Sequence, residues 1–257
     1  MKTKIVALLG AMLFGTSVFA AEITPYGTFN YKYSHDENSS GKAYSKLEDN
    51  GSNIGIDIDD IGVEGQTIIG FAKLEVGVDT DDSGSDTFDS RLAYVGLSAN
   101  SIGDISVGRQ SHPFTDNIGG KTAVFNVYGS KADWNYASRS SQTIAYSNDL
   151  GIVSVDALGI VDGSSSNTDA FDEYEWTVST NLFDSDISVG YADDVNNDIS
   201  YWGAGASTSI GPITLGSSYT PVGTKGTRRR GSGISGVISP PGKSFMGARS
   251  QIGGGGG

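Results

Sequence analysis

The sequence predicts an all-β protein, specifically a transmembrane antiparallel up-and-down β-barrel. Three observations predict this fold: about eleven short segments of alternating polarity, connectors that alternate between short and long, and an N-terminal export signal. Glycine accounts for 37 of the 257 residues. No later apolar run reaches the roughly 18 residues that a membrane-spanning helix needs, so strands are the expected spanning elements.

The first twenty residues have the pattern of a cleavable signal peptide. Lys2 and Lys4 supply the positive start, the apolar run IVALLGAMLFG follows, and Val18 and Ala20 are the small residues of a cleavage site. We therefore predict a signal peptide over 1–20 with cleavage before Ala21, and export of the remaining chain.

Residues 21–221 divide into short segments in which polar and apolar side chains alternate. In 172–180, Tyr174 and Trp176 share one face and Glu173 and Glu175 share the other. The apolar faces are thin and aromatic at their ends, which is typical of lipid contact and not of a sandwich core. The predicted strands are 24–33, 52–59, 68–78, 90–98, 104–110, 141–147, 151–159, 172–180, 185–192, 200–209 and 212–219.

The connectors between these segments alternate in length, as they do when one barrel rim has short turns and the other has long loops. The expected long loops are 34–51, 79–87, 111–138, 160–171 and 193–199. The longest contains several aromatic residues, which indicates that it packs against something, and it could fold into the lumen.

Composition excludes several classes of function. The chain has no cysteine, so disulfides and thiolate chemistry are absent. Residues 21–221 hold nine Lys or Arg and thirty Asp or Glu. This strongly acidic body repels nucleic acid and attracts cations, so no nucleic-acid partner is expected.

Neither a cofactor nor a dedicated metal site is expected. The acidic stretch DTDDSGSD (79–86) begins like a calcium loop, but Ser90 occupies the twelfth position, where a bidentate glutamate is needed. A solvated acidic loop is the favoured interpretation, and loose divalent binding that bridges to lipopolysaccharide is the alternative.

Three stretches resemble the general diffusion porins of Gram-negative outer membranes: AEITPYGTFNYKY, SRLAYVGLS with the following DISVGRQ, and SRSSQTIAYSND. The resemblance covers the chain to about Tyr219. It implies a 16-stranded barrel, usually a homotrimer, with a third loop that folds inward and narrows the pore. It also implies a passive channel for small hydrophilic solutes and ions, in contact with outer-membrane lipid and lipopolysaccharide, and no enzyme activity.

Two arginines are the candidate basic residues of the pore wall. Arg91 has the parity opposite to Leu92 and Tyr94, so if those two face lipid it points into the lumen. Arg139 has the parity opposite to Ile144 and is expected to point inward too. The resemblance implies that both belong to a basic ladder opposite the third loop.

On the inward loop, the candidate constriction residues are Asp116 and Asp133, with Lys121 between them. Two further positions that are basic in the family fall near Thr28 and Asn53, which are uncharged. With a thinned basic ladder and an acidic body, we expect a preference for cations.

The end of the chain departs from the resemblance. Residues 222–257 contain six cations and no acid, alternation stops, and five glycines replace the expected terminal aromatic. We expect a disordered, basic, glycine-rich tail, as in a truncated or frame-shifted porin. The alternatives are a non-functional porin fragment, a secreted soluble β-rich binding or adhesion protein and, least favoured, a hydrolase that uses Ser111 and His112.

Overall fold

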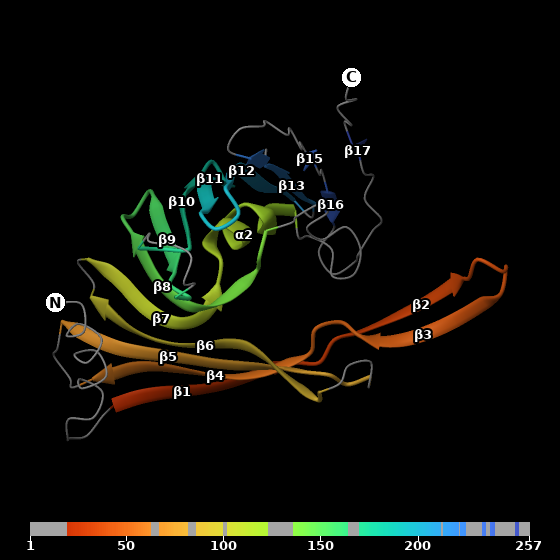
Figure 1. Cartoon of the computed structure of the whole chain (residues 1–257), viewed down its shortest axis with the longest axis horizontal. Helices are drawn as coiled ribbons and strands as arrows, with labels where there is room; N and C mark the ends of the chain where they lie inside the picture. Colours follow the sequence, from red (N-terminus) through yellow and green to blue (C-terminus); the bar gives the residue numbers. More distant parts are fainter. Residues whose placement is uncertain are drawn as a thin grey trace.

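The computed structural model consists mostly of antiparallel strands (Figure 1). No helix among the described residues is long and apolar enough to cross a membrane. The structure describes residues 20–62, 67–81, 86–99, 102–122, 136–163, 170–211, 213–220, 222–224, 233–234, 237–239 and 250–251.

The strands form one curved sheet in which successive strands pair with one another, except for a hairpin inserted after the first strand. Eleven of them lie between residues 20 and 219, as predicted, and they have the topology of an up-and-down barrel wall. The order is β1 (Ala20–Thr28), β4 (Asn53–Gly62), β5 (Ile68–Val78), β6 (Phe88–Ala99), β7 (Gly103–Ser111), β8 (Arg139–Asp149), β9 (Ser154–Ile160), β10 (Glu173–Leu182), β11 (Ser185–Asp194), β12 (Ile199–Ile210), β13 (Ile213–Tyr219) and β16 (Val237–Ser239).

The inserted hairpin corrects two predictions. The stretch 24–33 is not one strand, and 34–51 is not a loop: β2 (Tyr31–Glu37) and β3 (Ala43–Asp49) pair with each other and extend away from the curved sheet (Figure 1). The side chain of Asn38 closes the turn by accepting hydrogen bonds from the backbone of Ser40 and Lys42, both at 3.0 Å. Polar residues fall on both strands, so composition alone resembled a loop.

The connection between β10 and β11 shows how a short turn closes a hairpin. Leu182 pairs with Ser185, so only Phe183 and Asp184 connect the two strands. Both have positive φ, 51° and 59°, as in the type I′ turn whose twist matches that of the flanking strands.

Further short strands follow β13, within the segment for which the sequence predicts a tail. They are β14 (Val222–Thr224), which pairs with β12, and β15 (Gly233–Ile234), which pairs with β17 (Ser250–Gln251). Because β16 pairs with β13, the sheet continues past Tyr219.

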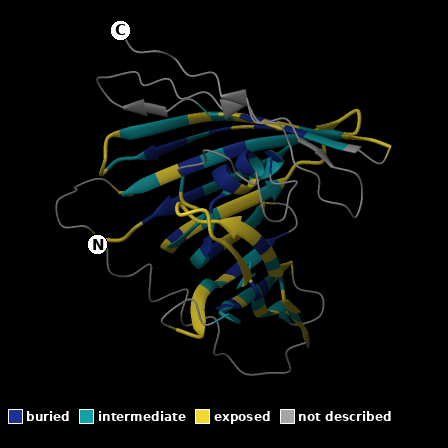
Figure 2. Cartoon of the chain, turned by 90° about the vertical axis from the view of Figure 1, so that its right-hand side faces the viewer, coloured by how far each residue is buried: buried dark blue, intermediate teal, exposed yellow. Residues whose placement is uncertain are grey.

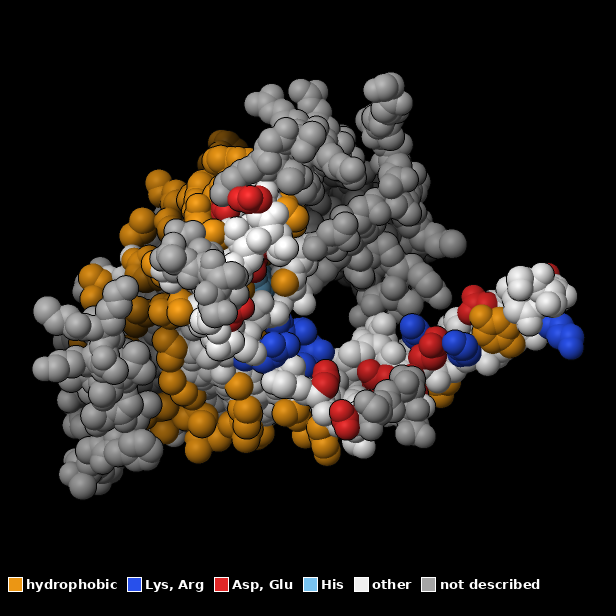
Figure 3. Space-filling view, in the orientation of Figure 1, with side chains coloured by type: hydrophobic (Ala, Val, Ile, Leu, Met, Phe, Trp, Pro, Cys, Tyr) orange, Lys and Arg blue, Asp and Glu red, His pale blue; other side chains and the backbone are white. Residues whose placement is uncertain are grey.

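The two faces of the sheet differ in polarity (Figure 3). Hydrophobic side chains cover the convex surface, and Lys and Arg side chains gather in the hollow. The alternation predicted in β10 is present, with Tyr174 exposed and Glu175 buried. This surface suits lipid outside and water inside. Exposed apolar residues include Ile54, Ile56, Leu74, Val95, Ile105, Ile144, Val189 and Trp202.

The hollow holds a short inward-folded segment, which we call the inner segment, residues His112–Thr122. It contains helix α2 (Pro113–Asn117) and the 3-10 helix η2 (Gly119–Thr122). Figure 2 shows buried residues concentrated around α2. The apolar core formed by Phe114, Ile118 and Ala192 lies here, between the inner segment and the sheet.

Candidate functional site

The inner segment is held on the concave wall by an aromatic and aliphatic cluster. Phe114 and Ile118 are completely buried. The ring of Tyr136 lies 5.3 Å from that of Phe114 and 5.0 Å from that of Tyr201, in edge-to-face arrangements. Such contacts add to the stabilisation from burial, so the segment is part of the packed interior.

A patch of glycines on the wall makes room for the inner segment, and we call Gly190, Gly203, Gly205 and Gly216 the glycine patch. A Cβ at Gly203 would lie 2.9 Å from both Phe114 and Ile118. A Cβ at Gly216 would lie 1.8 Å from a backbone oxygen of the segment. The missing side chains therefore allow the backbone of the segment to approach the wall closely.

Three polar residues, His112, Ser140 and Glu175, hold the start of the inner segment, and we call them the His112 anchor. His112 Nδ1 lies 2.9 Å from Glu175 Oε2, and His112 Nε2 lies 2.8 Å from Ser140 Oγ. Glu175 Oε1 accepts a hydrogen bond from the backbone N–H of Phe114 at 3.1 Å. One buried carboxylate thus binds both the histidine and the start of α2, which stabilises one loop position.

The surroundings of the anchor favour the charged form of the histidine. Burial by itself lowers the pKa of His112, but the hydrogen bond and charge of Glu175, with the charges of Glu173 and Asp116, outweigh it and raise the pKa above its ordinary 6.5. Burial and the same two glutamates raise the pKa of Tyr136 as well. A protonated His112 donates to Glu175 through Nδ1 and can also donate to Ser140 Oγ through Nε2.

The anchor also bears on the least favoured alternative, a hydrolase that uses Ser111 and His112. The His112 ring is fully buried and contacts Ser140 and Glu175. The order serine, histidine, carboxylate also occurs in hydrolases, but here the ring has no exposed surface at which a substrate could react. Ligand atoms of His112, Glu173 and Glu175 lie within 4.8 Å of one another and could hold a metal ion, although two of them are engaged in the anchor.

The far end of the segment has two further attachments. Asn117 donates hydrogen bonds to Asp156 at 2.9 Å and to Thr177 at 2.7 Å. Lys121, a candidate constriction residue, forms an ion pair with Asp186 on β11. Its ammonium therefore lies against the wall and attaches η2 to β11.

Arg91 lies on the concave side, as predicted, but the cause is a β-bulge and not simple alternation along the strand. Glu75 pairs with Leu92 while the next residue of β5 pairs with Ser90, so Arg91 is the extra residue of a β-bulge. Leu92 and Tyr94 line a cavity on the concave side, so the condition that they face lipid, on which the parity argument for Arg91 rested, is not met. The bulge changes parity by one residue, and this turns Arg91 inward.

Arg91 forms an ion pair with Glu75, whose side chain is nearly buried. Tyr26 also donates its hydroxyl to Glu75, at 2.9 Å. Its ring crosses Gly55, where a Cβ would be 2.4 Å from the ring. Nothing in the local sequence distinguishes Glu75, because its partner lies on a neighbouring strand in a register that the sequence does not reveal.

Arg139 is half-buried at the start of β8 and lies within electrostatic range of Arg91, Glu75 and Asp116. Later in the same strand Gln142 has a positive φ of 58° at an irregularity in the register. The side on which Arg139 lies therefore cannot be inferred from the side on which Ile144 lies. The structure therefore brings three of the predicted site residues together. Asp133 lies outside the described residues.

Another basic group is paired across the strands. Lys73 Nζ lies 2.8 Å from Asp57 Oδ1 and 4.7 Å from the centroid of the Tyr26 ring. Together with the pairs of Arg91 and Lys121, this leaves three wall or loop cations each facing a carboxylate. Paired charges attract passing ions less than single ones do.

Comparison with known proteins agrees with this architecture. Residues 6–244 match the family described as Gram-negative porin. OmpF of Salmonella typhi, solved in complex with daunomycin, is 17% identical with a TM-score of 0.60, and the match covers 84% of this chain and 67% of that one. An anion-selective porin from Comamonas acidovorans is 16% identical with a TM-score of 0.64, covering 86% and 75%. The trimer form of in-vitro folded OmpT of Vibrio cholerae is 15% identical with a TM-score of 0.51, covering 88% and 85%.

No protein of curated function matches the chain. The family match extends over most of the sequence, and the solved porins share its curved antiparallel sheet. The chain therefore belongs to the Gram-negative porin family, whose members are passive channels of the outer membrane and not enzymes.

Proposed function

We propose that this chain forms a passive diffusion channel for small hydrophilic solutes and ions, narrowed by the inward-folded segment within 112–138. The observation that carries this proposal is the position of α2 and η2 on the concave wall, where the His112 anchor and the glycine patch hold them. A segment fixed in this way keeps the cross-section of the pore constant, which a selective channel requires.

The proposed constriction has basic and acidic sides. Arg91 and Arg139 supply the basic side and Asp116 supplies the acidic side, with Asp133 as a further loop acid. Electrostatic coupling of Arg139 to Asp116 supports this assignment. Lys121 contributes by holding η2 to Asp186, so that its effect on solutes is mainly indirect.

We further propose that the channel prefers cations. Lys73, Arg91 and Lys121 are each paired with a carboxylate, while Asp104, Asp116 and Asp156 line a cavity on the concave side. The resulting excess of negative charge favours cations in a narrow polar passage. The anion-selective porin from Comamonas acidovorans shares the fold at 16% identity, and selectivity depends on individual side chains and not on the fold.

The proposal includes export by the signal peptide over 1–20, contact of the convex face with outer-membrane lipid and lipopolysaccharide, and assembly as a homotrimer. The exposed apolar side chains of the convex face support contact with lipid. A solved porin with the same fold has been described in a trimer form, which supports the proposed assembly.

The experiment is a planar-bilayer recording of the refolded full chain under a KCl gradient. With cation preference, the dilute side becomes positive at zero current. Asp116→Asn reduces that reversal potential and Arg139→Gln increases it, because each changes the charge at the constriction by one unit. An anion-type potential would overturn the preference for cations.

Heat-modifiable mobility on a gel serves as the control for folding. If protein that passes this control inserts in the bilayer without conducting, the channel proposal fails and the chain is a non-functional porin fragment. If the protein stays in buffer without detergent, the assignment to a membrane is contradicted instead.

A further inference from the structure

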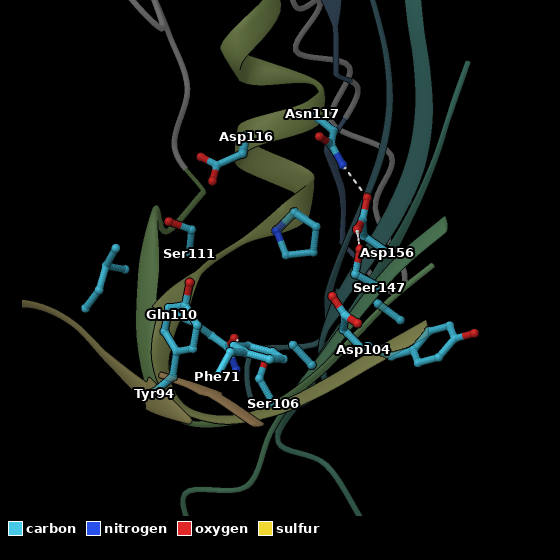
Figure 4. Close-up of a pocket in the computed structure, with 15 residues that line it drawn as sticks. Phe71, Tyr94, Asp104, Ser106, Gln110, Ser111, Asp116, Asn117, Ser147 and Asp156 are labelled. Carbon is cyan, nitrogen blue, oxygen red and sulfur yellow. Dashed lines mark hydrogen bonds between the residues drawn. The ribbon is translucent and has the colours of Figure 1, made fainter. Parts of the chain in front are cut away.

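Below the inner segment the concave face is hollowed into a cavity of about 340 Å³ (Figure 4). It lies between α2 and the ends of the strands nearest the short turns, and its volume is at the lower end of the range of small-molecule sites. Its wall is formed by strands β5 to β9 and by residues of the inner segment, so an occupant would lie beside the proposed constriction.

The floor of the cavity is aromatic. Phe71 lies flat across Gly96, where a Cβ would be 2.2 Å from the phenyl ring. Tyr94 stands almost perpendicular to it, with centroids 6.4 Å apart and an interplanar angle of 79°. Because glycine lets the ring lie against the wall, the face of Phe71 is presented to the cavity (Figure 4). That face carries the negative part of the ring quadrupole.

Carboxylates flank this floor on two sides. Figure 4 shows Asp104 and Asp156 on one side and Asp116 on the other. Asp156 is held in place by hydrogen bonds donated by Ser147 at 2.6 Å and Asn117 at 2.9 Å. Asn117 belongs to the inner segment, so the loop itself orients this acid and completes the cavity.

The cavity lining carries acidic and neutral side chains. None of the fifteen lining residues, all in the described part of the chain, is a lysine, arginine or histidine. The hydroxyl of Ser111 adds hydrogen-bonding capacity, whereas the Gln110 amide accepts from Ser106 and donates to Thr143. An aromatic floor between carboxylates attracts a positive charge attached to an apolar body, whereas a fully hydrated metal ion gains nothing from the ring face.

We propose that this cavity is a binding subsite for small organic cations, in which an ammonium or amidinium group lies between Asp104, Asp156 and Asp116 and the apolar body rests on Phe71. The inference rests on the proposed channel function and narrows its substrate class. It predicts that organic cations are retained in the passage longer than inorganic cations of the same charge.

The test is saturation-transfer NMR on the refolded full chain in detergent, with phenethylammonium as the probe and phenylethanol as its neutral counterpart. Protein-free micelles measure partition into detergent. We expect saturable binding of the cation and at least about tenfold weaker binding of the alcohol. Equal binding of the two probes, or no binding of the cation, overturns the proposal.

Three variants locate the site. Asp104→Asn together with Asp156→Asn weakens binding of phenethylammonium by about tenfold, since each lost charge accounts for a few-fold. Phe71→Leu keeps the apolar volume, removes the ring face and weakens binding about threefold. Asp184→Asn is the matched control, because it removes an acid from a short turn where asparagine tolerates the positive φ. Asp184→Asn removes one charge where the double variant removes two, so an effect of net charge alone would weaken binding a few-fold in this control, and that result refutes the subsite.

Binding in detergent does not require conduction, so the two proposals fail separately. A chain that conducts without binding phenethylammonium retains the channel function and loses the subsite. A chain that binds without conducting retains the subsite and loses the channel.

Discussion

His112 Nδ1 and Glu175 Oε2 lie 2.9 Å apart with both side chains buried, and this pair joins the root of the inner segment to the barrel wall. The two residues are 63 positions apart in the chain. Removing one partner of a buried ion pair costs about 3–5 kcal/mol, because the remaining charge stays buried without its counter-charge. The pair therefore stabilises both the fold and the position of the loop.

The first prediction concerns pH. Because the folded pKa of His112 is raised above 6.5, the stabilisation from its charge is fully present below pH 6.5 and is lost as pH rises through the raised folded pKa. We expect the free energy of unfolding, measured with urea in lipid or detergent, to fall over that window. Glu173, Glu175, Asp116 and Tyr136 surround the ring and set the size of this effect.

His112→Gln is the matched variant for this prediction, since it keeps a hydrogen-bonding side chain but cannot carry the charge. It should be less stable than the wild type at low pH and should lack the decline above pH 6.5. A decline of the same size in this variant would assign the pH dependence to other groups.

The second prediction concerns the glycine patch. Gly216→Ala places a methyl group where the backbone oxygen of Lys121 now lies, so η2 must move away from the wall. We expect a loss of about 1–3 kcal/mol in the free energy of unfolding, typical of overpacking, and a changed single-channel conductance. Gly62→Ala is the control, because a Cβ there meets its neighbours at an ordinary 3.6 Å. Equal effects of the two variants would contradict the role of the patch.

The third prediction concerns Arg91 and Glu75, whose side chains are 21% and 10% exposed. Arg91→Ala leaves Glu75 with the hydroxyl of Tyr26 as a partner, and Glu75→Ala leaves the arginine without its acid. A double-mutant cycle on the free energy of unfolding should give a coupling of about 1–3 kcal/mol. A coupling near zero would show that the pair does not form in the membrane.

The fourth prediction tests which side of β6 faces lipid. Val95 is 36% exposed on the convex face, so Val95→Arg places a charge in hydrocarbon at a cost of about 2–4 kcal/mol near the midplane. Leu92→Arg adds the same charge on the concave side, where water can hydrate it. The fraction that folds into lipid vesicles, read from heat-modifiable mobility, should fall for Val95→Arg alone. The reverse result would restore the parity that the sequence suggested.

The class of fold follows from local features of the sequence. Alternation in a strand has a period of two that does not depend on which strands are neighbours, so Tyr174 and Glu175 could be assigned to opposite faces. Segment lengths and connectors located the strands of the sheet up to Tyr219 in the same local way, except that the predicted segment 24–33 spans parts of β1 and β2. The acidic composition and the resemblance to porins required no coordinates either.

The assembly of the site depends on contacts between distant parts of the chain. The bulge at Arg91 arises from the register between β5 and β6, and one extra residue reverses every parity argument beyond it. The His112 anchor, the pairing of Lys121 with Asp186 and the fit of the inner segment on the glycine patch all join residues far apart in the chain. A local pattern carries no information on such partners, because the register between strands is set by the packing of the whole wall.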